Sequence, residues 1–225
     1  MPYNNHPSPL LNQLFKDKPY QGANPADAAF LFVGLDANYA ADIQDRDIFP
    51  YLLDYHRDGV QFWRKYGVHH PFLLPEYRGK TDGRRYHQNF AKLGFKSEHA
   101  HLVSFVEVLD IPTTGRSSLH PRDLDSNHLA QLHVWICGSG NKNVFVSKGV
   151  LKLLGSTKVF DWLPSDPQAK TILPRLWAGQ GVNIFLHLHL SNYGKFQQQM
   201  DREAEAVQGM INKYTGSVML EGANG

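Results

Sequence analysis

The stretch FLFVGLDANYA, residues 30–40, decides the fold class. It begins with a short apolar run that ends at Gly34, which is typical of a strand buried on both faces of a sheet. Asp36 follows two residues later, so a carboxylate stands at the end of a predicted core strand. This raises the question of what a carboxylate does at the edge of an apolar core.

Similar apolar runs recur along the chain and predict three further strands, at 101–111, 143–147 and 182–190. Segments with helical spacing lie between and after them, at 48–67 (two pieces broken at Asp58-Gly59), 82–93, 127–141, 148–155 and 195–214. Because strands alternate with helices, we predict an α/β fold, a three-layer sandwich with a mostly parallel central sheet.

The length of 225 residues is that of one domain, and 42% hydrophobic residues are enough for a sizeable core. We expect a single domain over residues 1–225. Within it, residues 1–28 form an N-terminal arm with one short helix near 10–16, residues 29–214 form the α/β core, and residues 215–225 form a flexible tail.

The charge balance and the cysteine count limit the classes of function that the chain can have. There are 23 basic and 21 acidic side chains, so only a local patch would favour nucleic acid. The single cysteine, Cys137, excludes an intramolecular disulfide and a cysteine-based zinc site, which fits a reducing compartment. No leader-like segment and no long apolar run is present, so we expect a cytoplasmic protein that does not enter a membrane.

Two predicted strands end in residues that can carry out chemistry. The first leads into Asp36, and the last into His189, Ser191 and Asn192. Ligands of open α/β sheets bind outside the carboxyl ends of the strands. A carboxylate and an imidazole there can act as general base and charge stabiliser, so we expect Asp36 and His189 to face one cleft.

The order of these motifs resembles the uracil-DNA glycosylase superfamily, and most closely its mismatch-specific uracil/thymine branch. GLDANY (34–39) is similar to the first motif, typified by GQDPY or GINPG, and HLSN (189–192) to the HPS-type turn after the last core strand. Three landmarks between them are also similar: QFWRKYGV (61–68), VEVLDIPTTG (106–115) and KNVFVSKGVLKLL (142–154). The resemblance covers roughly residues 28–212 and indicates a diverged member.

The resemblance implies a DNA glycosylase-like hydrolase that excises a deaminated or damaged base by N-glycosidic bond hydrolysis, without a cofactor. It assigns activation of water to Asp36 and stabilisation of the leaving base to His189. Tyr39 would wall the pocket, and Ser191 would bind a phosphate. The other residues expected to bind substrate are Asn38, Phe105, Glu107 and Asn192.

The sequence departs from the family pattern at several positions. Ala37 and Leu190 replace the motif prolines, so we expect differently shaped turns. Val106 aligns with the base-reading asparagine, and the adjacent Glu107 could accept from a ring N–H but suits an amino group better than a carbonyl oxygen. Two alternatives therefore stay open: a non-catalytic nucleic-acid or nucleotide-binding module of the same fold, and a hydrolase of free nucleotides or nucleosides.

The segment RGKTDGRRYH (78–87) has four basic residues against one acidic residue. Arg78, Lys80, Arg84 and Arg85 are candidates for contacts with the phosphates of single- or double-stranded DNA, and a solvated loop is the alternative. The stretch from Asp36 to Asp58, with six aspartates against two arginines, opposes a phosphate backbone. We expect a monomer that binds DNA.

His187 and His189 alternate with leucines, so both imidazoles are predicted on one face of the last strand. A pair of this kind can bind zinc, but no HExxH or similar carboxylate spacing accompanies it, and no metal is expected. A buried core histidine fits His187 better than His189, which lies nearer the end of the strand.

Overall fold

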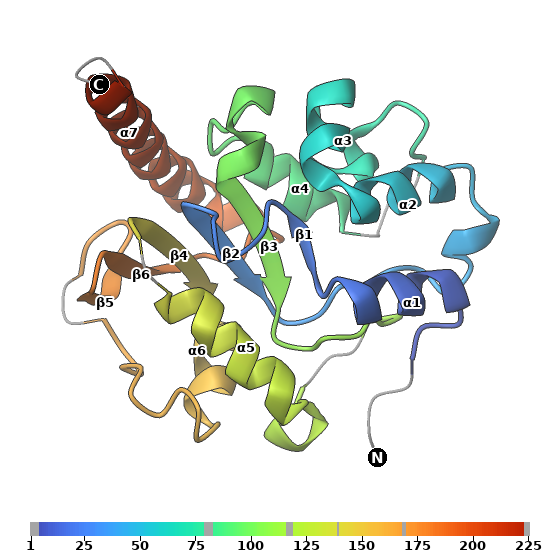
Figure 1. Cartoon of the computed structure of the whole chain (residues 1–225), viewed down its shortest axis with the longest axis horizontal. Helices are drawn as coiled ribbons and strands as arrows, with labels where there is room; N and C mark the ends of the chain where they lie inside the picture. The colour runs from blue at the N-terminus through green and yellow to red at the C-terminus, as the bar shows by residue number, and fades with distance from the viewer. Residues whose placement is uncertain (1–4, 79–82, 116–118, 139, 168–169, 223–225) are drawn as a thin grey trace.

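The chain folds around a six-stranded mixed sheet flanked by helices (Figure 1). The structure, a computed structural model, describes residues 5–78, 83–115, 119–138, 140–167 and 170–222. The strand order is β1-β3-β2-β4-β6-β5. The strands are β1 (Tyr20–Gly22), β2 (Phe30–Gly34), β3 (Val103–Glu107), β4 (Lys142–Ser147), β5 (Arg175–Gly179) and β6 (Val182–His187).

The inner strands of the sheet are parallel and its two edges are antiparallel. β2 pairs in parallel with β3 and β4, and β4 with β6, whereas β1 and β5 run antiparallel to their neighbours. The predicted mostly parallel sheet is therefore wrong at both edges. β1 is too short to show a pattern, and β5 joins β6 through Gln180 and Gly181, at φ 50° and 81°, a tight hairpin that lacks the usual Asn-Gly signal.

The helices are α1 (Pro9–Asp17), α2 (Phe49–Arg57), α3 (Gly59–Tyr66), α4 (Arg84–Ala91), α5 (Ser126–Cys137), α6 (Lys148–Gly155) and α7 (Gln197–Gly222). The predicted break at Asp58 is confirmed, since its carboxylate accepts from the Gln61 N–H and caps α3. Asp125 caps α5 in the same way. The expected cap of α4, Asp82, lies outside the described residues.

Both ends of the chain are more regular than expected. The N-terminal segment contributes α1, as predicted, and also β1 at the sheet edge. The flexible tail expected from residue 215 is wrong as far as Gly222, because α7 continues to that residue. Met and Leu in this last part favour helix.

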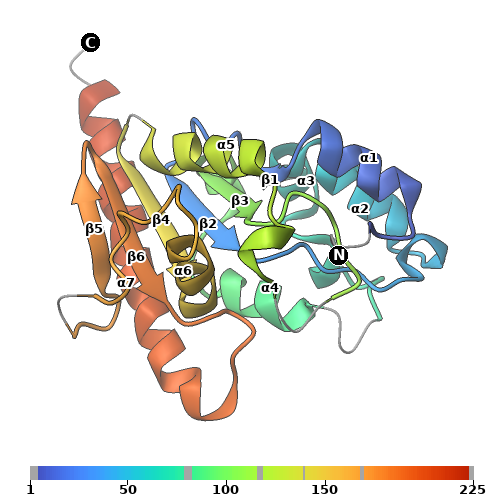
Figure 2. The same cartoon turned by 90° about the horizontal axis from the view of Figure 1, so that it is seen from below.

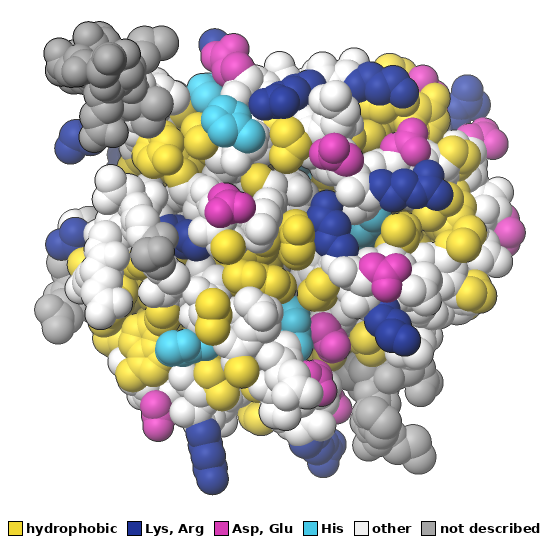
Figure 3. Space-filling model, in the orientation of Figure 1, with side chains coloured by type: hydrophobic (Ala, Val, Ile, Leu, Met, Phe, Trp, Pro, Cys, Tyr) yellow, Lys and Arg dark blue, Asp and Glu magenta, His cyan; other side chains and the backbone are white. Residues whose placement is uncertain are grey.

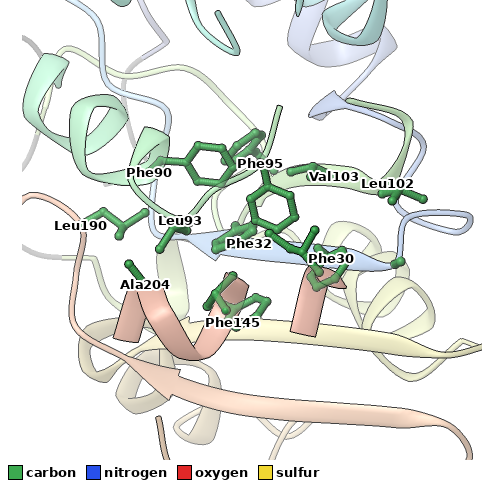
Figure 4. Packing of buried hydrophobic residues seen from close by; sticks show 14 of the residues in the cluster. Phe30, Phe32, Phe90, Leu93, Phe95, Leu102, Val103, Phe145, Leu190 and Ala204 are labelled. Atoms are coloured by element: carbon green, nitrogen blue, oxygen red, sulfur yellow. The ribbon is translucent and has the colours of Figure 1, made fainter. Parts of the chain in front are cut away.

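The two faces of the sheet bury different side chains. Phe30 and Phe32 of β2 face one side, with Phe145 stacked on Phe32 at 4.6 Å between ring centroids. Residues of α4 and α7 cover this aromatic face, as Figure 4 shows for Phe90 and Ala204. Leu31 and other aliphatic residues face α5 and α6 on the opposite side. Figure 2 shows α5 and α4 on opposite sides of the strands, which gives the three layers.

A third cluster fixes the segment that follows β2. Ala37, Tyr39 and Ile43 of this segment are buried with Leu11 of α1 and Leu52 of α2. Helices α1 and α2 therefore hold the connection after Asp36 as part of the core, although it contains little regular structure.

Candidate active site

A pocket of about 420 Å³ lies at the carboxyl ends of β2, β3 and β6. It is lined by the segment after β2, the end of β3, the first turns of α4 and the turn after β6. Seven of the residues predicted from the sequence line it together: Asp36, Asn38, Tyr39, Phe105, Glu107, His189 and Ser191. The sequence therefore predicted seven of the sixteen residues that line this pocket.

The other predicted residues that the structure describes lie outside the pocket lining. The Asn192 side chain does not line the pocket, and its carbonyl accepts from Asn89 on α4 at 3.2 Å. Arg78 is exposed, and Arg84 donates to the Tyr77 carbonyl at 3.5 Å. Arg85 is exposed on α4, and Lys80 lies outside the described residues.

Backbone hydrogen bonds extend the sheet beyond β2 and β3 and fix the Asp36 turn. The Val108 N–H donates to the Gly34 carbonyl at 3.0 Å, and Thr113 exchanges two bonds, accepting from the Tyr39 N–H at 2.9 Å and donating to the Ala37 carbonyl at 2.8 Å. These bonds hold the backbone on both sides of Asp36 in place.

The Asp36 carboxylate is oriented by a buried hydroxyl. Thr113 donates to its Oδ2 at 2.5 Å, and the Gly115 N–H donates to the Thr113 hydroxyl at 3.1 Å. Burial raises the pKa of Asp36, and the Thr113 hydrogen bond and His189 oppose that shift. Thr113 was missed by the sequence analysis, although it lies in the VEVLDIPTTG stretch that carried part of the resemblance.

His189 stands two residues beyond β6, exposed at the mouth of the pocket. Its Nδ1 accepts from the Ser191 N–H at 3.2 Å, so in the neutral ring Nε2 carries the proton. Partial enclosure lowers the pKa of His189, and the Asp36 carboxylate opposes the shift. The neutral imidazole thus has one N–H left to donate to a ligand.

The turn that holds His189 is tied to α4. Asn89 is buried and donates from its amide to the Leu190 carbonyl at 2.6 Å as well as to Asn192. Leu190 is itself buried in the aromatic cluster. The turn is therefore anchored by a side chain from α4 and by its own leucine.

Glu107 is the last residue of β3 and pairs with Gly34 across the sheet. Its carboxyl lies where a side chain on Gly34 would stand, so only glycine leaves room for it. Oε2 is buried without a hydrogen-bond partner in the described part of the chain. Burial, and then the nearby Asp36, raise the pKa of Glu107 well above its usual range, which favours the neutral acid.

A buried polar network holds the ring of Tyr39 in the pocket wall. Its hydroxyl and the His56 Nε2 are 2.8 Å apart, and Gln21 of β1 donates to the same hydroxyl at 3.4 Å. Tyr55 donates to the other end of the Gln21 amide at 3.1 Å. Burial lowers the pKa of His56 to about 3, so its ring is neutral. Sequence patterns gave no signal for these long-range partners.

Two further histidines line the pocket and had no predicted role. The rings of His70 and His87 are stacked with centroids 3.5 Å apart, and His69 is within 3.1 Å of His87. Burial lowers the pKa of all three, to about 3 for His87, so they form a neutral wall. Over the ranges that the structure describes, no group of three or more His, Cys, Asp or Glu residues is arranged to hold a metal ion.

Comparison of the chain with protein-family models, with curated proteins and with solved structures gave no match. Among the described helices, none is both long and apolar enough to cross a membrane.

Proposed function

We propose that this pocket hydrolyses the N-glycosidic bond of a deaminated or damaged base in DNA. The observation that carries the proposal is that Asp36 and His189, 153 positions apart in the numbering (189 − 36), line one pocket with Tyr39 and Phe105. The volume of about 420 Å³ is in the range of small-molecule sites and accommodates a base turned out of the helix.

In this mechanism Asp36 holds a water against the sugar. The ionised carboxylate accepts a proton from the water, whose oxygen attacks C1′. The C1′–N bond breaks, and its electron pair leaves with the base. The His189 Nε2–H donates a hydrogen bond to the base as negative charge develops on it. The proton held by Asp36 is then returned, through solvent, to the base anion, so the products are the neutral free base and an abasic sugar, and Asp36 is ionised again.

The pocket rim offers one contact suited to nucleic acid. Arg85 lies over the ring of Tyr193, 4.4 Å from its centroid, and Tyr193 is 68% exposed in the turn that carries His189. An exposed aromatic ring next to a cation can bind an unstacked base and its phosphate.

A free nucleoside is the second candidate substrate, because none of the described pocket-lining residues is Lys or Arg. Figure 3 also shows acidic and basic side chains interspersed over the face in view, without a continuous basic surface there. A substrate without phosphates would need no such surface.

The test is a single-turnover excision screen with duplexes that contain uracil, hypoxanthine, xanthine or a mismatch, together with the free nucleosides. Asp36→Asn keeps the shape but removes the base, so we expect excision to slow by roughly 10²–10⁴-fold. Asp161→Asn, at an exposed position outside the pocket lining, is the matched control and should not change the rate.

Equal excision by Asp36→Asn and wild type would refute the assignment of the base. Cleavage of nucleosides but of no duplex would establish the second candidate. Absence of cleavage of any substrate by the wild type would leave a binding module.

A further inference from the structure

Two carboxyl groups line the pocket, those of Asp36 and Glu107, and the mechanism above uses only Asp36. The Glu107 carboxyl folds across Gly34 toward the pocket, and its Oε2 is enclosed without a partner among the described residues. A buried polar atom without a partner is rare in a folded chain and calls for an explanation. A bound ligand that completes its hydrogen bonds is such an explanation.

The surroundings of Glu107 favour a proton on this carboxyl. The titratable side chains that face it are Asp36, Tyr39, Tyr55, Tyr86, His70, His87 and His189. None of these is a lysine or arginine, and burial keeps the imidazoles of His70 and His87 neutral by lowering their pKa. A second negative charge beside Asp36 would therefore have no cation to balance it.

The proton has a preferred oxygen. Placed on Oε2, it would be a buried donor without an acceptor, whereas an unpaired acceptor at that position is tolerated more readily. The proton therefore belongs on Oε1, where a ligand in the pocket can accept it.

We propose that the Oε1–H of Glu107 donates a hydrogen bond to an exocyclic carbonyl oxygen of the bound base and so selects deaminated bases. Deamination of cytosine or adenine replaces an amino group, which is a donor, by a carbonyl, which is an acceptor. The fixed donor pairs with uracil or hypoxanthine, and two donors face each other when the parent base is bound. This inference rests on the proposed function for its class of ligand and assigns the residue that reads the base.

The test measures equilibrium binding of free uracil, cytosine, hypoxanthine and adenine by calorimetry, so that it does not depend on excision. The wild type should bind uracil over cytosine, and hypoxanthine over adenine, by at least about 10-fold. Glu107→Gln keeps an N–H donor without an ionisable proton and should keep the preference. Glu107→Leu should abolish it, and Glu76→Gln, at an exposed glutamate outside this pocket, is the control.

The pH dependence separates this role from that of a general acid. In the wild type the preference should disappear as the pH rises through the pKa of Glu107, because a carboxylate cannot donate, while Glu107→Gln should show no such loss. A general acid would lose its excision activity in Glu107→Gln, which has no proton to transfer, whereas the binding preference of Glu107→Gln reports the hydrogen bond alone.

Three results would overturn the inference: no preference for the carbonyl-bearing bases in the wild type, an unchanged preference in Glu107→Leu, or loss of preference in Glu107→Gln. A binding preference without excision would support the inference while the proposed function fails. Excision together with a binding preference that does not depend on Glu107 would support the proposed function while the inference fails.

Discussion

An ionisable side chain stands at the amino end of one inner strand, and another stands at the carboxyl end of a second inner strand, and the two differ in their hydrogen bonds. Lys142 begins β4 and is 2% exposed, and its Nζ donates to the carbonyls of Pro25 and Trp135, each at 2.7 Å. Glu107 ends β3, and its Oε2 has no partner within the described residues. The Lys142 ammonium is therefore hydrogen-bonded by the chain, whereas Oε2 of Glu107 is not hydrogen-bonded within the described residues.

This difference separates a structural role from a functional one. Lys142 ties the segment before β2 and the end of α5 to the sheet, and its hydrogen bonds are complete without a ligand. Glu107 stands at the carboxyl edge, where ligands of α/β sheets bind, and its carboxyl is desolvated without compensation. A protein that keeps such a group gives up stability for a site.

The largest effect that tests this comparison is expected at Lys142. Lys142→Met keeps most of the volume but leaves buried carbonyls without a donor, so we expect the free energy of unfolding to fall by about 2–4 kcal/mol. Denaturant unfolding at pH 7 measures it. Base excision by the folded variant should match that of the wild type. A free energy of unfolding within about 0.5 kcal/mol of the wild-type value would contradict the structural role.

The same measurement on Glu107→Gln gives the other half of the comparison. Because the folded-state pKa of Glu107 is raised above its unfolded value, its stabilising contribution is complete below the unfolded pKa and is lost as the pH rises through the folded one. The variant should therefore gain on the wild type with rising pH in that window, by up to about 1.4 kcal/mol per pH unit. A constant difference would mean that Glu107 does not titrate abnormally.

The hydrogen bond from Thr113 influences the pKa of Asp36, the other carboxyl of the pocket. Thr113→Val removes the donor to Asp36 with little change of shape, and that donor lowers the pKa of Asp36. The acid limb of the excision profile should move to higher pH, with rates about 10-fold lower on the limb and near wild type above it. Thr114→Val, at the exposed neighbouring position, is the control. An equal loss at every pH would assign Thr113 a purely structural role.

The inner strands and the residues at their carboxyl ends could be predicted because each carries a local signal. An apolar run ends at Gly34, and Asp36 follows two positions later and lines the pocket. Its place at the end of a strand does not depend on the order of the strands in the sheet. His189 reaches the pocket by the same rule, whereas Glu107 was expected from the resemblance, inside a strand predicted over 101–111 that in fact ends at this residue. Residues that act through distant partners have no such pattern.

Gln21 and Asn89 show why the remaining residues escaped prediction. Gln21 lies on a three-residue edge strand and meets Tyr39 only after β1 pairs with β3, and Asn89 meets the turn after β6 across 101 positions of sequence. The state of Glu107 was misjudged for a related reason. The sequence suggested a carboxylate, whereas burial and the neighbouring Asp36 favour the neutral acid by raising its pKa.

The smallest expected effect lies at the rim of the pocket, where Arg85 stands beside Tyr193, in the turn that carries His189. Its guanidinium covers Tyr193, and no salt bridge to it is found within the described residues. If Arg85 neutralises one phosphate, Arg85→Ala should make the slope of log affinity against log salt shallower by about 0.9 on duplex DNA.

The affinity of Arg85→Ala for duplex DNA at moderate salt should fall only about 3-fold, because a single exposed charge contributes little. Fluorescence anisotropy across a salt series measures both quantities. Lys158→Ala, at an exposed position next to the aliphatic cluster on the other face of the sheet, should leave the slope unchanged. Identical slopes for all three proteins would remove Arg85 from the DNA contact. The nucleoside reading would then gain weight, since its substrate needs the pocket edge with Asp36 and Glu107 but no cation at the rim.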